Sequence, residues 1–225
     1  RFSLFFPEKR EFFLENAPIF QFGRQGGRFR RVAGSFEQVP ADAIPFFSRR
    51  IGISQGRLVP VLGGARVTGR AGPYTLGMFS MQTDDFEEEP STNFSVVRVR
   101  RDVLGRSDVG GLFINKYANG DRYNRTYGVD ANFNFFGGLD LTSYLLKTET
   151  PGVKHRDVAG SAFVVWTDSR IQAEAQHTVI GENFNPEGGF LRRTDFRRTF
   201  VQSQFSPRPA SLALVRQFKF GDSFD

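Results

Sequence analysis

Turn residues interrupt the chain about every ten positions, and the breaks alternate between short and long. Short breaks fall at residues 72–73, 104–108, 137–138, 168–169 and 206–209, and longer polar ones at residues 84–92, 118–124, 150–156 and 182–190. Gly, Asn, Asp and Pro at this spacing, with little helical periodicity between them, are typical of all-β folds. Tight turns on one side and long loops on the other favour an up-and-down antiparallel barrel that crosses an outer membrane.

The composition is compatible with a membrane barrel and not with a bundle of membrane helices. The 225 residues are 39% hydrophobic with a mean hydropathy of −0.35. The longest nearly apolar run, residues 158–166, is far shorter than the roughly 20 residues of a spanning helix, whereas a membrane strand needs only about 9–11. The absence of cysteine excludes disulfides and structural zinc sites with cysteine ligands, and we expect no cofactor or metal.

The net charge is +6 and comes mostly from arginine. Nucleic-acid binding is disfavoured because the arginines are dispersed through strand-like segments rather than gathered in one tail or patch. A cationic barrel interior, or a rim that faces anionic lipopolysaccharide, uses the same residues more naturally.

Polar and apolar residues alternate along the predicted strands. In residues 127–136, Val129 and Ala131 share one face, while Asp130 and Asn132 share the other. The predicted lumen-lining residues are Arg66, Arg98, Arg100, Asp130, Asn132, Asn134, Gln172, Glu174 and Gln176. Such side chains can guide anionic or sugar-like solutes, or they can form a wall-to-wall network that fills a narrow barrel.

Aromatic residues beside the turns are predicted to form interfacial girdles. These girdle candidates are Tyr74, Phe94, Tyr127, Phe135, Phe136 and Trp166. A soluble β-sandwich also alternates apolar and polar residues, so it remains the structural alternative, and the turn asymmetry favours the barrel.

The chain divides into two parts. Residues 1–43 read as entry strands and an irregular segment at the periplasmic mouth or in the lumen, and residues 44–225 read as barrel strands. About eleven strands are expected from Ile44 onward, whereas bacterial single-chain barrels close with an even number. The odd count, together with a start at Arg1 without an export signal, predicts an incomplete portion of a larger barrel in a longer protein.

Several stretches resemble a bacterial family, domain of unknown function 5916. They are FFPEKREFFLENAPIF (5–20), FFSRRIG (46–52), LGGARVTGRAGPYTLGMFSMQT (62–83), STNFSVVRVRRDVLGRSDVGGLFIN (91–115), YNRTYGVDANFNFF (123–136) and IGENFNPEGGFLRR (180–193). The resemblance implies the N-terminal part of an outer-membrane barrel that is usually preceded by a carbohydrate-binding family 9-like domain. Some relatives are labelled membrane-associated hydrolases, a label that we attribute to the missing domain and do not transfer to this chain.

Other polar groups carry weaker signals. His155 and His177 are expected to be loop or interfacial residues, and no serine stands in an elbow motif, so an enzyme is disfavoured without being excluded. The acids Asp84, Asp85, Glu87, Glu88 and Glu89 lack the spacing of a calcium loop, which favours a solvated loop. Residues 7–11 are either a docking point for the preceding domain or lumen wall, or a polar turn.

The sequence therefore predicts a protein of the cell outer membrane: a pore, a receptor or a surface component. Its expected partners are membrane lipid and lipopolysaccharide, with no nucleic acid. A link to carbohydrate, through the missing N-terminal domain, is implied by the family resemblance alone. The alternatives are a membrane-associated hydrolase and a soluble β-sandwich binding module.

Overall fold

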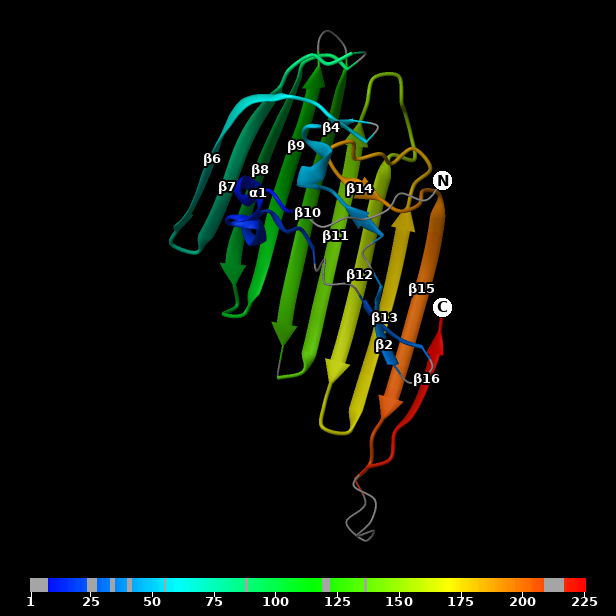
Figure 1. Cartoon of the computed structure of the whole chain (residues 1–225). Coiled ribbons are helices and arrows are strands. Elements are labelled where there is room, and N and C mark those ends of the chain that lie inside the picture. The colour runs from blue at the N-terminus through cyan, green and yellow to red at the C-terminus, as the bar shows by residue number, and fades with distance from the viewer. Residues whose placement is uncertain are drawn as a thin grey trace.

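The computed structural model describes residues 8–23, 28–32, 35–39, 42–54, 56–87, 89–118, 122–135, 137–208 and 217–225. One antiparallel sheet of ten strands dominates it, with the order β16-β15-β13-β12-β11-β10-β9-β8-β7-β6 (Figure 1). The strands are β6 (Val61–Ala71), β7 (Tyr74–Thr83), β8 (Thr92–Val103), β9 (Ser107–Ala118), β10 (Tyr123–Phe135), β11 (Leu139–Glu149), β12 (Val158–Thr167), β13 (Ile171–Ile180), β15 (Phe196–Phe205) and β16 (Phe220–Phe224). The all-β, up-and-down antiparallel prediction is confirmed.

The connections reproduce the predicted asymmetry with one exception. The β6–β7, β8–β9, β10–β11 and β12–β13 hairpins turn tightly at one end of the sheet, and the β7–β8, β9–β10, β11–β12 and β13–β15 connections are longer and lie at the other end, called here the loop end (Figure 1). The β15–β16 connection was predicted as a short break at residues 206–209, and this prediction is wrong, since the connection spans residues 206–219 at the tight-turn end. Gly72 and Gly137 stand in two of the tight turns with φ of +55° and +63°. Glycine adopts this left-handed conformation without the clash that a Cβ would cause, so these residues suit their turns.

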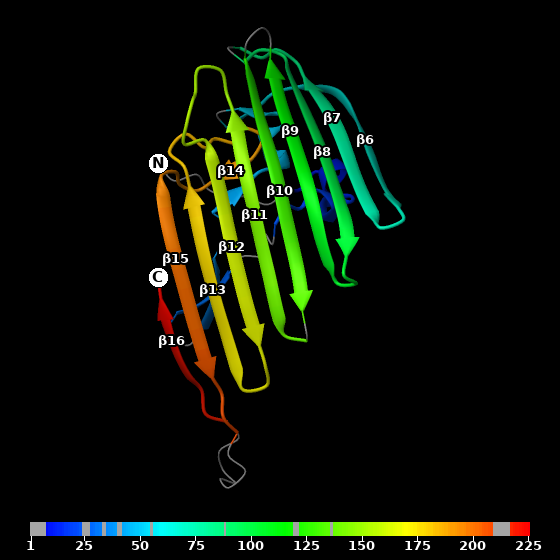
Figure 2. The same cartoon turned by 180° about the vertical axis from the view of Figure 1, so that it is seen from behind.

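A second, thinner layer covers one face of the sheet. It contains α1 (Glu11–Leu14), η1 (Ala17–Phe20), β1 (Arg28–Val32), β2 (Ser35–Val39), β3 (Ala43–Ile44), η2 (Ser48–Arg50), β4 (Ile53–Ser54) and β5 (Arg57–Leu58). These elements lie in front of the sheet in Figure 1 and behind it in Figure 2. We call this layer, over residues 8–58, the N-terminal segment. Its β3 pairs with β14 (Phe190–Leu191), which belongs to the long β13–β15 connection.

The two faces of the sheet differ in a way that is unusual for a protein in water. On the covered face, Val96, Leu112 and Leu146 are buried against the N-terminal segment and the β13–β15 connection. On the opposite face, here the open face, Val129 is 59% exposed and Leu145 is 56% exposed. No second sheet of comparable size exists in the described part of the chain, where the other sheets have two strands each. The open face is bare in Figure 2.

The hydrophobic core lies in the loop-end half of the covered face. Phe20 and Phe22 of the N-terminal segment pack there with sheet residues such as Phe79 and Ile114 and with Phe184 of the β13–β15 connection. The remainder of this face carries the polar residues described below. Because one half of the covered face is apolar and the other half is polar, the residues of this face are only partly polar along each strand.

The sheet stays open. Its edge strands β6 and β16 each pair with one neighbour, β7 and β15, and with no other described strand. Both edges therefore present backbone groups that a further strand can satisfy.

Candidate functional site

The strand register brings all the predicted lumen-lining residues to the covered face. Gly110 pairs with both Arg100 and Asp130, and its neighbour Leu112 pairs with Arg98, so these residues share one side. The same alternation places the rest there: Arg66, Asn132, Asn134, Gln172, Glu174 and Gln176. These residues therefore share one face of the sheet.

An ion pair between Arg98 and Asp130 forms the centre of this surface. The two guanidinium Nη atoms donate to the two carboxylate oxygens over 2.7 and 2.8 Å, and both side chains are 1% exposed. Such bidentate geometry is the strongest arrangement for an arginine and a carboxylate. A buried pair of this kind is expensive to separate, since either partner alone would be a buried, uncompensated charge.

The same ion pair holds the N-terminal segment. Arg98 Nε donates to the carbonyl of Gln21 over 3.1 Å, and the backbone N–H of Gly23 donates to Asp130 Oδ2 over 2.8 Å. The Arg98 guanidinium also lies 5.3 Å from the ring centroid of Phe22. Three consecutive residues of the segment thus contact one charged pair on the sheet.

Two glycines of the sheet make room for this contact. A Cβ at Gly110 would lie 2.3 Å from Arg98 Nη1 and 2.7 Å from Asp130 Oδ1. A Cβ at Gly128 would lie 2.7 Å from the Phe22 ring. These separations are too short for non-bonded atoms, so the segment fits a surface shaped for it.

Two further arginines of the sheet bind the N-terminal segment at other points. Arg66 of β6 donates to the carbonyls of Phe12 and Glu15, the latter over 2.8 Å, and pairs with the Glu15 carboxylate. Arg198 of β15 donates to Asp42 over 3.0 Å. Burial raises the pKa of the Asp42 carboxyl, against the opposing effect of nearby arginines. Arg198 escaped the sequence prediction, although it alternates in phase with Gln202 and Gln204.

The other covered-face residues form a shorter-range polar network. Asn132 donates to Asp108 over 3.0 Å, and Asn134 donates to Asp140. Gln176 donates to Ser161 over 3.0 Å and to Thr178 over 3.2 Å. The remaining members are Arg100, whose buried Nε has no partner among the described residues, the half-buried Glu174 and the exposed Gln172.

The aromatic residues separate into two groups. Tyr74, Tyr127 and Trp166 are exposed on the open face, and Phe135 is half-buried on that same face. Phe94 instead lies on the covered face, is 6% exposed and belongs to the core, because it alternates in phase with Val96 and Arg98. The girdle prediction is therefore wrong for Phe94. Phe136 lies outside the described residues.

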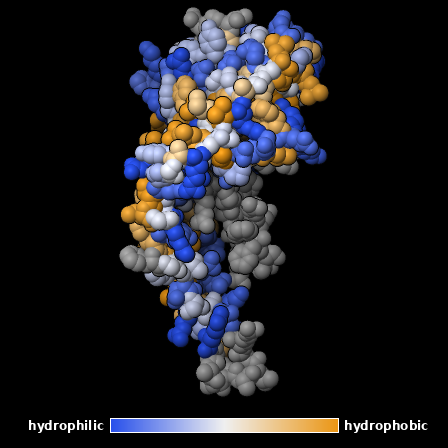
Figure 3. Space-filling view, turned by 90° about the vertical axis from the view of Figure 1, so that its left-hand side faces the viewer, coloured by the Kyte–Doolittle hydropathy of each residue, from blue (hydrophilic) through white to orange (hydrophobic). Residues whose placement is uncertain are grey.

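Hydrophobic side chains line the open face along most of its strands. The exposed ones are Val67, Tyr74, Leu76, Met78, Val99, Tyr117, Tyr127, Val129, Leu145, Val158, Val164, Trp166, Ile171, Val201, Phe205, Phe220 and Phe224. In a view onto the β6 edge, hydrophobic residues follow part of the left-hand margin, which is the open face (Figure 3). So many exposed hydrophobic side chains on one face are unusual for a monomeric protein in water.

The two histidines and the acidic loop have separate partners in the described part of the chain. His177 Nδ1 lies 2.8 Å from Thr199 Oγ1 on the open face, and the His155 carbonyl accepts a hydrogen bond from Asn183. Glu87 pairs with Arg57, while Glu88 lies outside the described residues. Among the residues that the structure describes, no three histidine, aspartate or glutamate side chains are grouped as a metal site requires.

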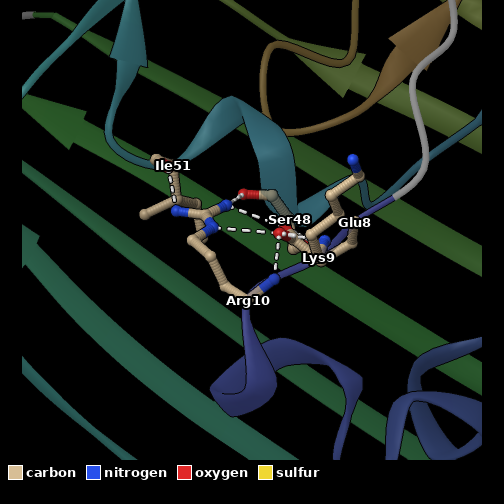
Figure 4. Close-up of polar contacts among 5 residues, drawn as sticks. All are labelled: Glu8, Lys9, Arg10, Ser48 and Ile51. Atoms are coloured by element: carbon tan, nitrogen blue, oxygen red, sulfur yellow. Dashed lines mark hydrogen bonds and ion pairs between the residues drawn. The ribbon is translucent and has the colours of Figure 1, made fainter.

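The charged turn near the start of the described chain closes the N-terminal segment on itself. Arg10 donates to Glu8 and to the backbone carbonyls of Ser48 and Ile51, each over 2.8 Å through its Nη atoms, and Ser48 Oγ donates to Glu8 over 2.6 Å (Figure 4). Burial opposes ionisation of Glu8, but the hydrogen bonds from Arg10, Ser48 and the backbone outweigh it and lower its pKa to about 2. Residues 7–11 were predicted to be a docking point or a polar turn. Among those that the structure describes, Arg10 pairs with Glu8 and binds backbone carbonyls of the N-terminal segment itself.

A polar cleft at the loop end was not anticipated from the sequence. Two adjoining hollows of about 320 and 370 Å³ share five lining residues: Glu89, Pro90, Thr92, Lys116 and Glu187. Lys116 Nζ lies 2.8 Å from Glu187 Oε2. Asn124 orders the wall by accepting from the backbone N–H of Glu187 over 3.1 Å. The cleft joins strand ends to the distant β13–β15 connection, so no local pattern in the sequence marks it.

No protein-family model matches this chain, and neither a curated protein nor a solved structure matches it. The likeness to domain of unknown function 5916 accordingly stays a prediction from the sequence.

No helix in the described part of the chain combines the length and the apolar character needed to span a membrane.

Proposed function

We propose that this chain forms part of the wall of an outer-membrane β-barrel whose interior is occupied by the N-terminal segment. The proposal rests chiefly on one observation: the sheet covers the face that carries its buried ion pair and its hydrophobic core, and it leaves bare the opposite face, on which many hydrophobic side chains are exposed. In water this distribution exposes many hydrophobic side chains, whereas in a bilayer it matches the outward apolar band and polar interior of membrane barrels. The turn asymmetry adds support, because short turns and long loops at opposite ends are typical of these proteins.

The sheet edges fit the same proposal. An isolated open sheet in lipid would leave edge N–H and C=O groups without partners, which is why membrane sheets close. Strands beyond those described, from the rest of a longer protein, would pair with β6 and β16 and complete the wall. Ten strands then form a fraction of the final barrel.

Within the pore, receptor and surface-component possibilities, the packing favours a receptor or surface component. The Arg98–Asp130 pair, Arg66 and Arg198 all bind the N-terminal segment rather than face a water-filled channel. The loop-end cleft offers a carboxylate, an ammonium group and an amide at the outer entrance of the interior. A role in carbohydrate handling would suit this polar cleft, and its basis is the family resemblance.

The experiment is expression of the full-length gene, followed by membrane fractionation and gel electrophoresis of heated and unheated samples. We expect the protein in the outer-membrane fraction, extractable by detergent, with a migration that changes on heating because the closed barrel resists the detergent at room temperature. We also expect little swelling of proteoliposomes in sugar solutions. A protein that is purified without detergent and migrates identically with and without heating would contradict the proposal.

A further inference from the structure

A hollow in the open face lies across β10, β11, β12 and β13. Its floor consists of small residues that pair in register across the strands: Ala131 with Ser143, and Ser143 with Ala162. Gly160 adds the next position toward the loop end. Because these side chains are short beside larger neighbours, they leave a cavity of about 680 Å³ with a largely apolar lining.

Larger residues border the hollow, and two cations stand next to them. Val158 pairs in register with Lys147, and Val179 pairs with Arg197, so both cations lie on the open face at the loop-end side of the hollow. Lys147 Nζ is 3.7 Å from Asp157, a long ion pair, and the Lys147 side chain is 59% exposed. Arg197 is exposed and has no ion-pair partner within the described ranges of the chain.

A cation on the membrane face requires an explanation, because an unpaired charge near hydrocarbon is costly unless it reaches the headgroup level. Lys147 is the third residue from the end of β11, and Arg197 is the second residue of β15. Both therefore lie near the loop end of the sheet. Their long side chains can extend toward the interface and meet anionic headgroups there. The hollow begins just below them, where acyl chains would start.

The geometry points to a specific site for a phosphorylated lipid of the loop-side leaflet, with its phosphates at Lys147 and Arg197 and an acyl chain in the hollow. The inference deepens the proposed function and rests on it, since it requires the open face to contact lipid. Lys147 and Arg197 are separated by three strand spacings, roughly 14 Å at about 4.8 Å per strand. One phosphate cannot bridge that span, so the ligand class that fits best is a glycolipid with a phosphate at each end of its headgroup.

Neighbouring groups complete the site. His177, whose register partners are Ala162 and Thr199, borders the floor and hydrogen-bonds Thr199. The pair offers a polar contact at the depth of ester or amide linkages, between the cations and the hydrocarbon. Asp157 lies close to Lys147 and opposes an anion there, so Arg197 is expected to contribute more to phosphate binding.

The experiment measures lipid binding to the full-length protein in detergent micelles, by native mass spectrometry and by thermal shift. The probes are a diphosphorylated lipid A, the same lipid without phosphates, phosphatidylcholine and inorganic phosphate. We expect retention of the diphosphorylated lipid, about tenfold weaker binding for Arg197→Gln, the size of one charge-assisted hydrogen bond, and a smaller loss for Lys147→Gln. Ala162→Phe fills the hollow and should weaken binding with both cations present.

The matched control is Arg101→Gln, which removes an open-face arginine at the opposite, tight-turn end of the sheet and should leave binding unchanged. Equal affinity for the dephosphorylated lipid, or equal losses from Arg101→Gln and Arg197→Gln, would overturn the site. So would binding of inorganic phosphate as tight as that of the lipid. A protein that enters bilayers but shows no lipid preference refutes only this site, whereas one that does not enter bilayers refutes the proposed function as well.

Discussion

The two faces of the ten-stranded sheet differ in what covers them and in which side chains they carry. The covered face places charged residues such as Arg98 and Asp130 under the N-terminal segment. Glycines of the sheet leave room for this contact, because a Cβ there would clash with it. The open face carries valines and leucines, such as Val129 and Leu145, that leave more than half of their surface exposed. A water-soluble sheet buries its apolar face, so this contrast is the feature that the proposed function explains by contact of the open face with lipid.

Breaking the buried ion pair should have the largest effect. Arg98→Ala leaves Asp130 buried without a counter-charge and removes the hydrogen bond to Gln21, so we expect a loss of about 3–5 kcal/mol in the free energy of unfolding. Urea titration followed by tryptophan fluorescence measures it. The double variant Arg98→Met, Asp130→Leu removes both charges. Its loss in the free energy of unfolding should be smaller than that of Arg98→Met alone or of Asp130→Leu alone. Equal or additive losses would contradict the assigned pair.

A charge on the open face should come next. Val129→Lys places an ammonium group on the open face, which the proposed function sets against lipid, and we expect a loss of about 2–4 kcal/mol in bilayers. Leu104→Lys, an exposed leucine in the β8–β9 turn, is the control and should be nearly neutral. Unfolding by denaturant in defined liposomes measures both. If the two variants behave alike, the open face meets water and the contrast between the faces fails.

A methyl group added beneath the N-terminal segment should lower the free energy of unfolding by an intermediate amount. Gly110→Ala drives a methyl group into Arg98 and Asp130 and should cost about 1–3 kcal/mol. Gly111→Ala is the adjacent control on the open side, where the nearest atom to a new Cβ is 3.9 Å away. Thermal unfolding of both variants provides the measurement. A larger loss for Gly111→Ala would mean that the faces are assigned the wrong way round.

Acid should loosen the N-terminal segment with the smallest effect. Because the Glu8 pKa is lowered to about 2, its ionised form stabilises the fold above the unfolded pKa near 4.3, and this stabilisation is lost as the pH falls toward 2. Since the ion pair between Arg10 and Glu8 is partly exposed, we expect a loss of only about 1 kcal/mol in the free energy of unfolding. Protease protection of the segment between pH 6 and pH 2 reports it. Glu8→Gln should flatten this dependence, whereas the exposed Glu11→Gln should not.

Local features of the sequence predicted the strands and their faces well. The alternation around Asp130 and the turn glycines act over a few residues, so their consequences can be derived without the fold. Phe94 was misassigned because its place beside a turn outweighed its phase with Arg98, which the sequence also contained. Features that join distant segments gave no signal: Arg198 meets Asp42, and Lys116 meets Glu187. The N-terminal segment lacks a regular period, so its position over the sheet depends on these long-range contacts.

Trp166 offers the most direct test of whether lipid contacts the open face. It is the only tryptophan in the sequence, it is 43% exposed, and the strand register places it on that face. In vesicles containing brominated phospholipid, we predict strong quenching of its fluorescence and weak quenching by aqueous acrylamide. Trp166→Phe combined with Phe163→Trp moves the probe to the covered face, where lipid quenching should fall sharply. Strong acrylamide quenching of Trp166 without quenching by brominated lipid would contradict the account.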